Sequence, residues 1–119
     1  MKKFFKSFTY AINGIRTVFG KERNMNIHLI MATAVIVCAI IFHISGTEWL
    51  VCLLCIALVI SLEMLNSAIE RIVNIISPQI NPQAGQIKDI AAGAVLVSVI
   101  ISAIIGLIIF VPKAIDYVL

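Results

Sequence analysis

The sequence is poor in charge. Asp, Glu, Lys and Arg together make up 13% of its 119 residues, about half the share found in an ordinary soluble domain. Hydrophobic residues make up 61%, and the mean hydropathy is +1.10, whereas a soluble domain is about 45–50% apolar. The composition therefore disfavours a soluble fold and favours a single domain, residues 1–119, that crosses a membrane several times, and the helical segments described below predict that this domain is all-α.

Cysteine is also scarce, and the common nucleotide-binding motifs are missing. Cys38, Cys52 and Cys55 all lie inside apolar runs, with no histidine at ligand spacing. This pattern argues against a disulfide framework and against a zinc site. The chain has neither a P-loop nor a kinase-type glycine-rich loop, so an enzyme that uses a nucleotide would follow neither common soluble design. No nucleic-acid partner is expected.

Residues 1–24 are predicted to form an amphipathic helix that lies in the membrane interface. Large apolar side chains recur at helical spacing, among them Phe4, Phe8, Ile12 and Ile15, while lysines and arginines fall mainly on the opposite face. A basic face opposite a Phe/Ile face is typical of interfacial helices. The alternative is a helix that packs on the membrane bundle or binds a partner.

Three apolar runs are predicted as transmembrane helices over residues 27–45, 49–76 and 88–112. His28 and His43 lie at the two ends of the first run, where we interpret them as interfacial anchors. Residues 77–88 contain two prolines and are predicted to form a polar loop.

The second run fixes the depth of its polar residues. Its uninterrupted apolar part, Trp49–Leu62, has only 14 residues, too few to cross, so the helix must continue to Ile76. Glu63 then lies about 21 Å along the helix from Trp49, inside a hydrocarbon core of about 30 Å. A charge at that depth is costly and is usually functional.

The distribution of basic residues predicts the orientation. Eight of the nine lysines and arginines lie before the first span, at Arg71 or at Lys88, and only Lys113 lies on the other side. The positive-inside rule therefore places the N-terminus and the 77–88 loop in the cytoplasm, with the 45–48 turn and the C-terminus outside. A multi-pass protein of a bacterial cytoplasmic membrane is expected.

The predicted topology brings several polar groups to the cytoplasmic side of the membrane. Glu63, Asn66 and Glu70 share one helical face by their i, i+3, i+7 spacing, and this face ends near the depth of Glu22, Lys88 and Asp89. Carboxylate and amide oxygens suit Mg²⁺, a lysine can pair with phosphate, and a carboxylate in a low dielectric suits a general base. This set predicts phosphoryl transfer from a water-soluble donor to a lipid-soluble acceptor.

Simpler interpretations exist for single members of this set. Glu22 and Glu70 could be solvated interfacial charges, Asn66 could hold helices together by hydrogen bonding, and Arg71 is interpreted as a cytoplasmic anchor. Glu63 fits such an interpretation least, because its predicted depth makes an idle charge costly.

Three segments of the chain resemble the bacterial integral-membrane diacylglycerol kinase family, whose Gram-positive branch includes undecaprenol kinases. Residues 63–74, Glu-Met-Leu-Asn-Ser-Ala-Ile-Glu-Arg-Ile-Val-Asn, match the family signature Glu-x-x-Asn-Ser/Thr-Ala-x-Glu-x-x-x-Asp except at the last position. The Lys88-Asp89 pair and the small residues after it match the opening of the last helix. Gly14–Phe19 followed by Glu22 matches the N-terminal motif.

The resemblance implies a surface helix and three membrane helices, assembled as a homotrimer with active sites shared between subunits. It also implies transfer of phosphate from Mg-ATP to a lipid alcohol, with undecaprenol as the preferred acceptor and diacylglycerol as the alternative. By this resemblance Glu63 is the general base, and Glu22 and Glu70 hold the metal. Asn66, Lys88 and Asp89 order the nucleotide and the catalytic carboxylate.

Asn74 departs from the family signature, in which an aspartate is usual. The change removes a negative charge near the expected nucleotide, and we expect activity to survive, because the three carboxylates that match the base and the metal ligands are all present.

Two functions of other classes compete with a kinase. The first is a non-enzymatic membrane protein that relays protons or cations through buried acids, but the outer halves of the predicted spans are nearly free of polar groups. The second is a small structural subunit of a larger complex, in which Glu63→Gln would leave function intact.

Overall fold

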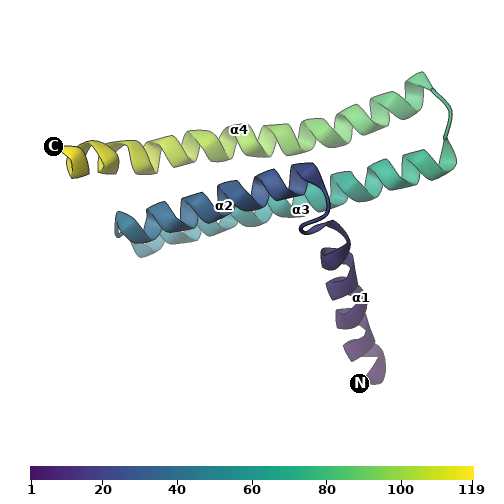
Figure 1. Cartoon of the computed structure of the whole chain (residues 1–119), viewed down its shortest axis with the longest axis horizontal. Coiled ribbons are helices and arrows are strands. Elements are labelled where there is room, and N and C mark those ends of the chain that lie inside the picture. The colour runs from purple at the N-terminus through teal and green to yellow at the C-terminus, as the bar shows by residue number, and fades with distance from the viewer.

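A computed structural model describes the whole chain, residues 1–119. It contains four α-helices and no strand, namely α1 (Lys2–Val18), α2 (Arg23–Ile41), α3 (Gly46–Ile76) and α4 (Pro82–Val118). The helices α2, α3 and α4 run side by side, whereas α1 leaves the bundle at a steep angle (Figure 1). The all-helical architecture predicted from the sequence is confirmed.

The three bundle helices are each long and apolar enough to cross a membrane. Only 13 of the 119 residues are buried, and large hydrophobic side chains such as Leu54 and Ile108 lie on the surface. A water-soluble monomer rarely exposes so much contiguous apolar surface. The exposed faces therefore suit a lipid environment, as expected for a membrane protein.

The first two helices differ in their bounds from the predicted segments. The predicted segment 1–24 contains α1, but α1 ends at Val18, and Gly20 follows with φ +77°, a conformation that glycine adopts without strain. The chain then re-enters a helix at Arg23, earlier than residue 27. This short turn places Glu22 directly before α2.

The third apolar run forms a longer helix than predicted. α4 begins at Pro82, so only residues 77–81 connect it to α3, and the expected loop over 77–88 is wrong in its second half. Proline is well suited to the first helical turn, where its missing N–H would be unpaired in any case, and the Asn81 side chain accepts a hydrogen bond from the Gln83 N–H. α4 also continues through Pro112 to Val118.

The turn between α2 and α3 is closed by hydrogen bonds at both helix ends. His43 has φ +50°, and the Ile44 N–H donates to the Ala39 carbonyl, which is the Schellman arrangement for ending a helix. Ser45 and Glu48 then form a capping box at the start of α3. The two helices are thereby held as a tight antiparallel pair.

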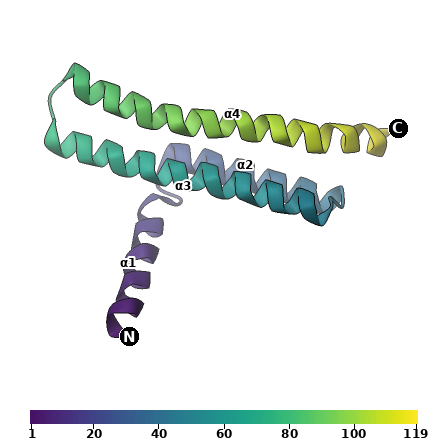
Figure 2. The ribbon, with the colours of Figure 1, turned by 180° about the vertical axis from the view of Figure 1, so that it is seen from behind.

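α3 is the central helix of the bundle, because both α2 and α4 pack along it. The view from behind shows α4 alongside α3 over most of its length, with the linker at the far end (Figure 2). At the α2–α3 turn, Ala39, Ile44, Cys52 and Ile109 form a buried apolar cluster. Most of the contacts that α3 makes within the chain are therefore with α2 and α4.

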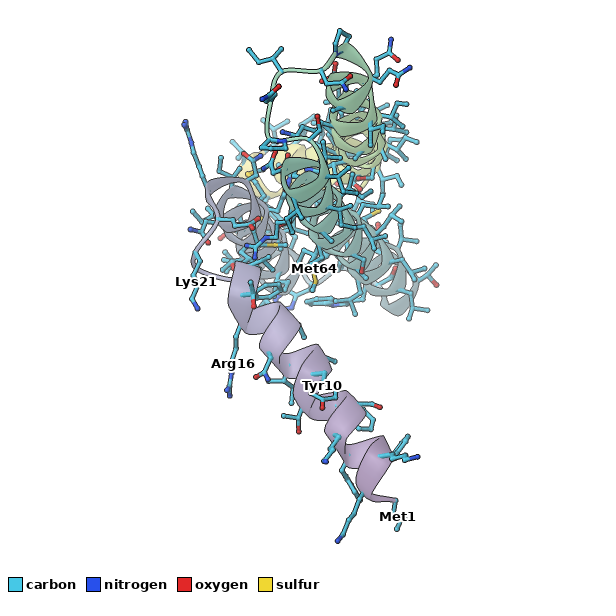
Figure 3. The ribbon with its side chains drawn as sticks, turned by 90° about the vertical axis from the view of Figure 1, so that its right-hand side faces the viewer. Met1, Tyr10, Arg16, Lys21 and Met64 are labelled. Carbon is cyan, nitrogen blue, oxygen red and sulfur yellow. The ribbon has the colours of Figure 1, made fainter.

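α1 is almost fully exposed, and its main contact with the bundle is with α3. Figure 3 shows it extending away from the bundle, with Met1 at its far end and Arg16 and Lys21 projecting to the same side. The last turn of α1 and the turn after it therefore connect the exposed helix to the part of α3 that carries the polar residues.

Candidate active site

Buried polar side chains gather on one turn of α3. Of the 13 buried residues four are polar, and three of these, Glu63, Asn66 and Ser67, lie within five positions of one another. The fourth, Ser98 on α4, donates its hydroxyl to the Val95 carbonyl of its own helix. Only the α3 group therefore directs buried polar atoms toward other parts of the molecule.

Asn66 links two glutamates along α3. Its Nδ2 donates to Glu63 Oε1 and to Glu70 Oε1, both at 3.5 Å, which is long for a hydrogen bond. Its Oδ1 is buried and has no partner in the structure. A buried acceptor without a donor is rare and costly, so this row of residues has capacity for a further polar group.

His28 approaches the same row from α2. Its Nε2 lies 3.4 Å from Glu63 Oε2, and the two side chains are 17% and 5% exposed. Glu63 is therefore contacted on one oxygen from its own helix and on the other from α2. The interpretation of His28 as only an interfacial anchor missed this contact.

A second set of contacts ties Glu22 to α3. Glu22 Oε1 accepts a hydrogen bond from Ser67 Oγ at 2.6 Å and from Arg71 Nη2 at 2.8 Å. The Ser67 hydrogen bond and the Arg71 charge lower the pKa of Glu22 from its usual value, against the opposing effect of burial. Glu22 is thus an ionised carboxylate at neutral pH, and Arg71 is its ion-pair partner rather than a free anchor.

The third set joins α3 to α4. Lys88 Nζ donates a hydrogen bond to Asn74 Oδ1. The amide oxygen thus supplies the acceptor that an aspartate would supply at this position, without the negative charge. This contact explains how the lysine can remain oriented although the chain departs from the family signature at Asn74.

These three sets follow one another along α3 rather than meeting at one point. Glu63 and Asn74 are eleven residues apart, about 16 Å along the helix, and the Glu22 contacts lie between them. Asp89 is exposed and its side chain makes no hydrogen bond. The structure brings together Glu63, Asn66 and Glu70 and separately joins Asn74 to Lys88, but the Asp89 side chain makes no hydrogen bond or ion pair with either group.

Three residues in these contacts were given no role in the site by the sequence alone. His28 and Ser67 receive their importance from the packing of α2 on α3, and Arg71 from its contact with Glu22. Periodicity shows which residues of one helix share a face, but it does not show which residue of another helix lies opposite.

The donor set fits Mg²⁺ in kind. The Glu22 and Glu70 carboxylates and the unpartnered Asn66 Oδ1 are hard oxygen donors, and Glu70 is exposed. No three His, Cys, Asp or Glu side chains of the single chain lie together as a metal site. Mg²⁺ in nucleotide sites takes one or two carboxylates and completes its shell with phosphate oxygens and water, which agrees with a sparse donor set.

An apolar cavity reaches the buried end of the polar row. It has a volume of about 170 Å³, lies between α2, α3 and α4, and twelve of its fifteen lining residues are hydrophobic. His28 lines it at one place and contacts Glu63 at another. The Glu63 carboxylate thus lies between a histidine that lines apolar space and a polar row that ends at the exposed Glu70, an arrangement suited to a reaction between a lipid and a water-soluble compound.

Comparison with known proteins agrees with this chemistry. The prokaryotic diacylglycerol kinase family matches residues 9–110. The chain belongs to this family. An undecaprenol kinase of Bacillus subtilis is 45% identical over 113 residues, which cover 95% of this chain and 92% of that protein.

More distant members of the diacylglycerol kinase family carry another substrate in their names. A diacylglycerol kinase of Synechocystis is 39% identical over 101 residues, 84% of this chain and 58% of that protein. One of Escherichia coli is 26% identical over 102 residues, 86% of this chain and 84% of that protein. As a member of the prokaryotic diacylglycerol kinase family, the chain is a lipid kinase that uses ATP as its co-substrate.

Proposed function

We propose that the protein transfers the γ-phosphate of Mg-ATP to undecaprenol and so forms undecaprenyl phosphate. The 45% identity to the Bacillus subtilis undecaprenol kinase, over nearly the full length of both chains, supports this acceptor. Diacylglycerol is the second candidate, because the Synechocystis and Escherichia coli relatives are named for it.

The observation that carries the proposal is the position of Glu63. Glu63 is only 3% exposed in a helix able to span the membrane, with His28, which lines an apolar cavity, on one side and the Asn66–Glu70 row on the other. A charge at this depth in a membrane is costly, and such charges usually have a function. The position suits a general base that meets the hydroxyl of a lipid.

Glu63 takes the proton of the lipid hydroxyl as the hydroxyl oxygen attacks the γ-phosphorus. The new oxygen–phosphorus bond forms while the bond from that phosphorus to the β–γ bridging oxygen breaks, and ADP leaves. Asn66 orients the Glu63 carboxylate through Nδ2. Phosphoryl transfer depends mainly on such positioning and on charge neutralisation, for which a small site is sufficient.

Glu22 and Glu70 are the proposed ligands for Mg²⁺, which when bound would neutralise charge on the phosphates. Ser67 and Arg71 hold Glu22 ionised and oriented. We assign Asn74, Lys88 and Asp89 to the nucleotide, with Lys88 as the cation for phosphate oxygens and Asp89 as an ordering group.

We place the polar residues on the cytoplasmic side, in agreement with the positive-inside rule, with α1 lying as an amphipathic helix in that interface. The proposed spans are 27–45, 49–76 and 88–112 within the single domain 1–119. A homotrimer with shared active sites is proposed as the assembly. Three observations support a site completed by a second subunit. One chain does not bring three metal-ligating side chains together, Glu70 and Asp89 are exposed, and the apolar surface is large.

The test uses purified protein in detergent micelles with Mg-ATP and either undecaprenol or diacylglycerol. Phosphate incorporation into each lipid is followed by radiolabelled ATP. We expect transfer to both or to undecaprenol alone, with undecaprenol giving the higher kcat/KM. A higher kcat/KM for diacylglycerol would overturn the proposed acceptor, and no transfer to either lipid would overturn the proposed reaction.

A further inference from the structure

His28 is the only side chain from another helix that makes a hydrogen bond or ion pair with Glu63. The His28 Nε2 lies 3.4 Å from Glu63 Oε2, while the other oxygen of the carboxylate accepts from Asn66 on α3 itself. Asn66 moves with Glu63, because both belong to α3. Only the contact from α2 can therefore fix where the carboxylate points across the helix interface.

The other charged groups nearby already have partners. Arg71 on α3 pairs with Glu22, and Lys88 on α4 donates to Asn74. Glu70, the remaining charged group on this face, is an acid and reaches Glu63 only through Asn66. No cation or other N–H donor competes with His28 for Glu63 Oε2.

The His28 ring also borders the apolar cavity between α2, α3 and α4. Its side chain is 17% exposed and contacts the carboxylate of Glu63, which does not itself line the cavity. A lipid hydroxyl that enters from the membrane side would meet Glu63 next to this ring. The distance of 3.4 Å is long for a hydrogen bond, as is common before substrate closes a site.

We propose that His28 is a positioning residue for the kinase reaction, donating from Nε2–H to Glu63 Oε2 and so aiming the carboxylate at the lipid hydroxyl. The inference rests on the proposed role of Glu63 as general base. Either the neutral ring with its proton on Nε2 or the protonated ring can supply this donor. A misaligned base lowers the rate of the chemical step far more than it weakens substrate binding.

Two substitutions separate donation from packing. His28→Gln keeps an N–H at nearly the same distance from the backbone but loses the ring, whereas His28→Phe keeps a ring of similar size but has no donor. We expect kcat to fall by less than about 5-fold in His28→Gln and by about 10- to 100-fold in His28→Phe. The KM for ATP should stay within about 2-fold in both, because the Asn74–Lys88 pair is remote from the ring.

The expected order of the two variants is opposite to the order that a structural role would give. If the ring only fills space, His28→Phe retains activity and His28→Gln loses it, and that order overturns the inference. Turnover is expressed per folded molecule, with the folded fraction taken from size-exclusion chromatography, so that poor folding of one variant does not imitate either result. Equal wild-type turnover in both variants also overturns the inference.

His43→Phe serves as the matched control, since His43 lies beyond the other end of α2 and its side chain makes no hydrogen bond or ion pair. Its turnover should equal that of the unaltered protein.

Glu63→Gln, measured in the same assay, separates the proposed role of Glu63 as the base from the proposed role of His28 as its positioning residue. If Glu63→Gln keeps full turnover, the role of the base fails and the His28 inference fails with it. If Glu63→Gln is inactive but His28→Phe is fully active, only the His28 inference fails.

Discussion

The two ends of the helix bundle use similar residues in different ways. The polar end comprises residues 22–28, 63–74 and 88–89. The aromatic end comprises residues 39–52 and 109–117. Each end has a glutamate paired with a basic residue, Glu22 with Arg71 and Glu48 with Lys113. Only the polar end also has a buried side-chain polar atom without a hydrogen-bond partner, Asn66 Oδ1.

At the aromatic end each polar contact completes a structural feature. Glu48 closes the capping box with Ser45 and also pairs with Lys113 at 3.1 Å. Phe42 lies against Tyr117 and near Phe110, beside the buried apolar cluster. The buried polar side-chain atoms at this end all have partners within the chain.

At the polar end the contacts around Glu63 are long and one acceptor is unused. Asn66 holds two glutamates at 3.5 Å each, and its own Oδ1 has no donor. A buried acceptor without a donor destabilises the folded state. Such an acceptor is expected where a bound ligand supplies the missing hydrogen-bond partner. The difference between the two ends supports our proposal that the polar end carries the chemistry, while the contacts of the aromatic end stabilise the bundle.

Replacing Asn66 should give the largest effect among the residues around Glu63. Asn66→Leu keeps a similar volume but removes the amide between the two glutamates, so the base loses its orientation. We expect kcat to fall by about 100-fold, measured as phosphate transfer per folded molecule. Ser98→Ala is the control, because it removes a buried hydroxyl that serves only its own helix. Turnover of Asn66→Leu within about 2-fold of the unaltered protein would contradict the assigned role.

Ser67→Ala should have a smaller effect, confined to metal and nucleotide binding. The substitution removes a 2.6 Å hydrogen bond to the ionised Glu22, a type of bond worth about 1.5–3 kcal/mol. Because Glu22 is partly exposed and keeps Arg71, we expect about a 10-fold increase in the concentration of Mg-ATP needed for half-maximal rate. Thr33→Val, which removes a hydroxyl bonded within α2, should change nothing. An equal loss in both variants would show that Glu22 is not specifically involved.

Asn74→Asp should have a small effect in the opposite direction. A carboxylate would hold Lys88 more firmly than the amide does, but exposed ion pairs contribute only about 0.2–1 kcal/mol. We therefore expect the KM for ATP to fall by about 2- to 3-fold with kcat unchanged. A higher KM would mean that the added negative charge repels the nucleotide more than it helps Lys88.

Ser45→Ala probes the aromatic end and should leave catalysis unchanged. Loss of the capping box typically lowers stability by about 1 kcal/mol, which thermal unfolding in detergent would detect. Turnover per folded molecule should equal that of the unaltered protein at a temperature where both are folded. A loss of turnover larger than the loss of folded protein would mean that the two ends are not separate in function.

The helices could be predicted from the sequence because the apolar runs are long and because Pro78 ends the second of them. The row Glu63–Asn66–Glu70 could be predicted too, because spacing within one helix defines a face. The start of α4 could not, because Pro82 and its Asn81 cap lie within a stretch that reads as a polar loop. The pairs Glu22–Ser67 and His28–Glu63 depend on how α2 is rotated about its axis against α3. This rotation could not be predicted from a single sequence.

The most direct test of the difference between the two ends compares the same substitution at both. Glu63→Gln and Glu48→Gln each replace a glutamate of α3 by its neutral isostere, and phosphate transfer from Mg-ATP to undecaprenol is measured for both per folded molecule. We expect Glu63→Gln to lose about 10²- to 10⁴-fold in kcat and Glu48→Gln to keep full turnover. Full turnover in Glu63→Gln, or an equal loss in both variants, would contradict the assignment of the chemistry to the polar end.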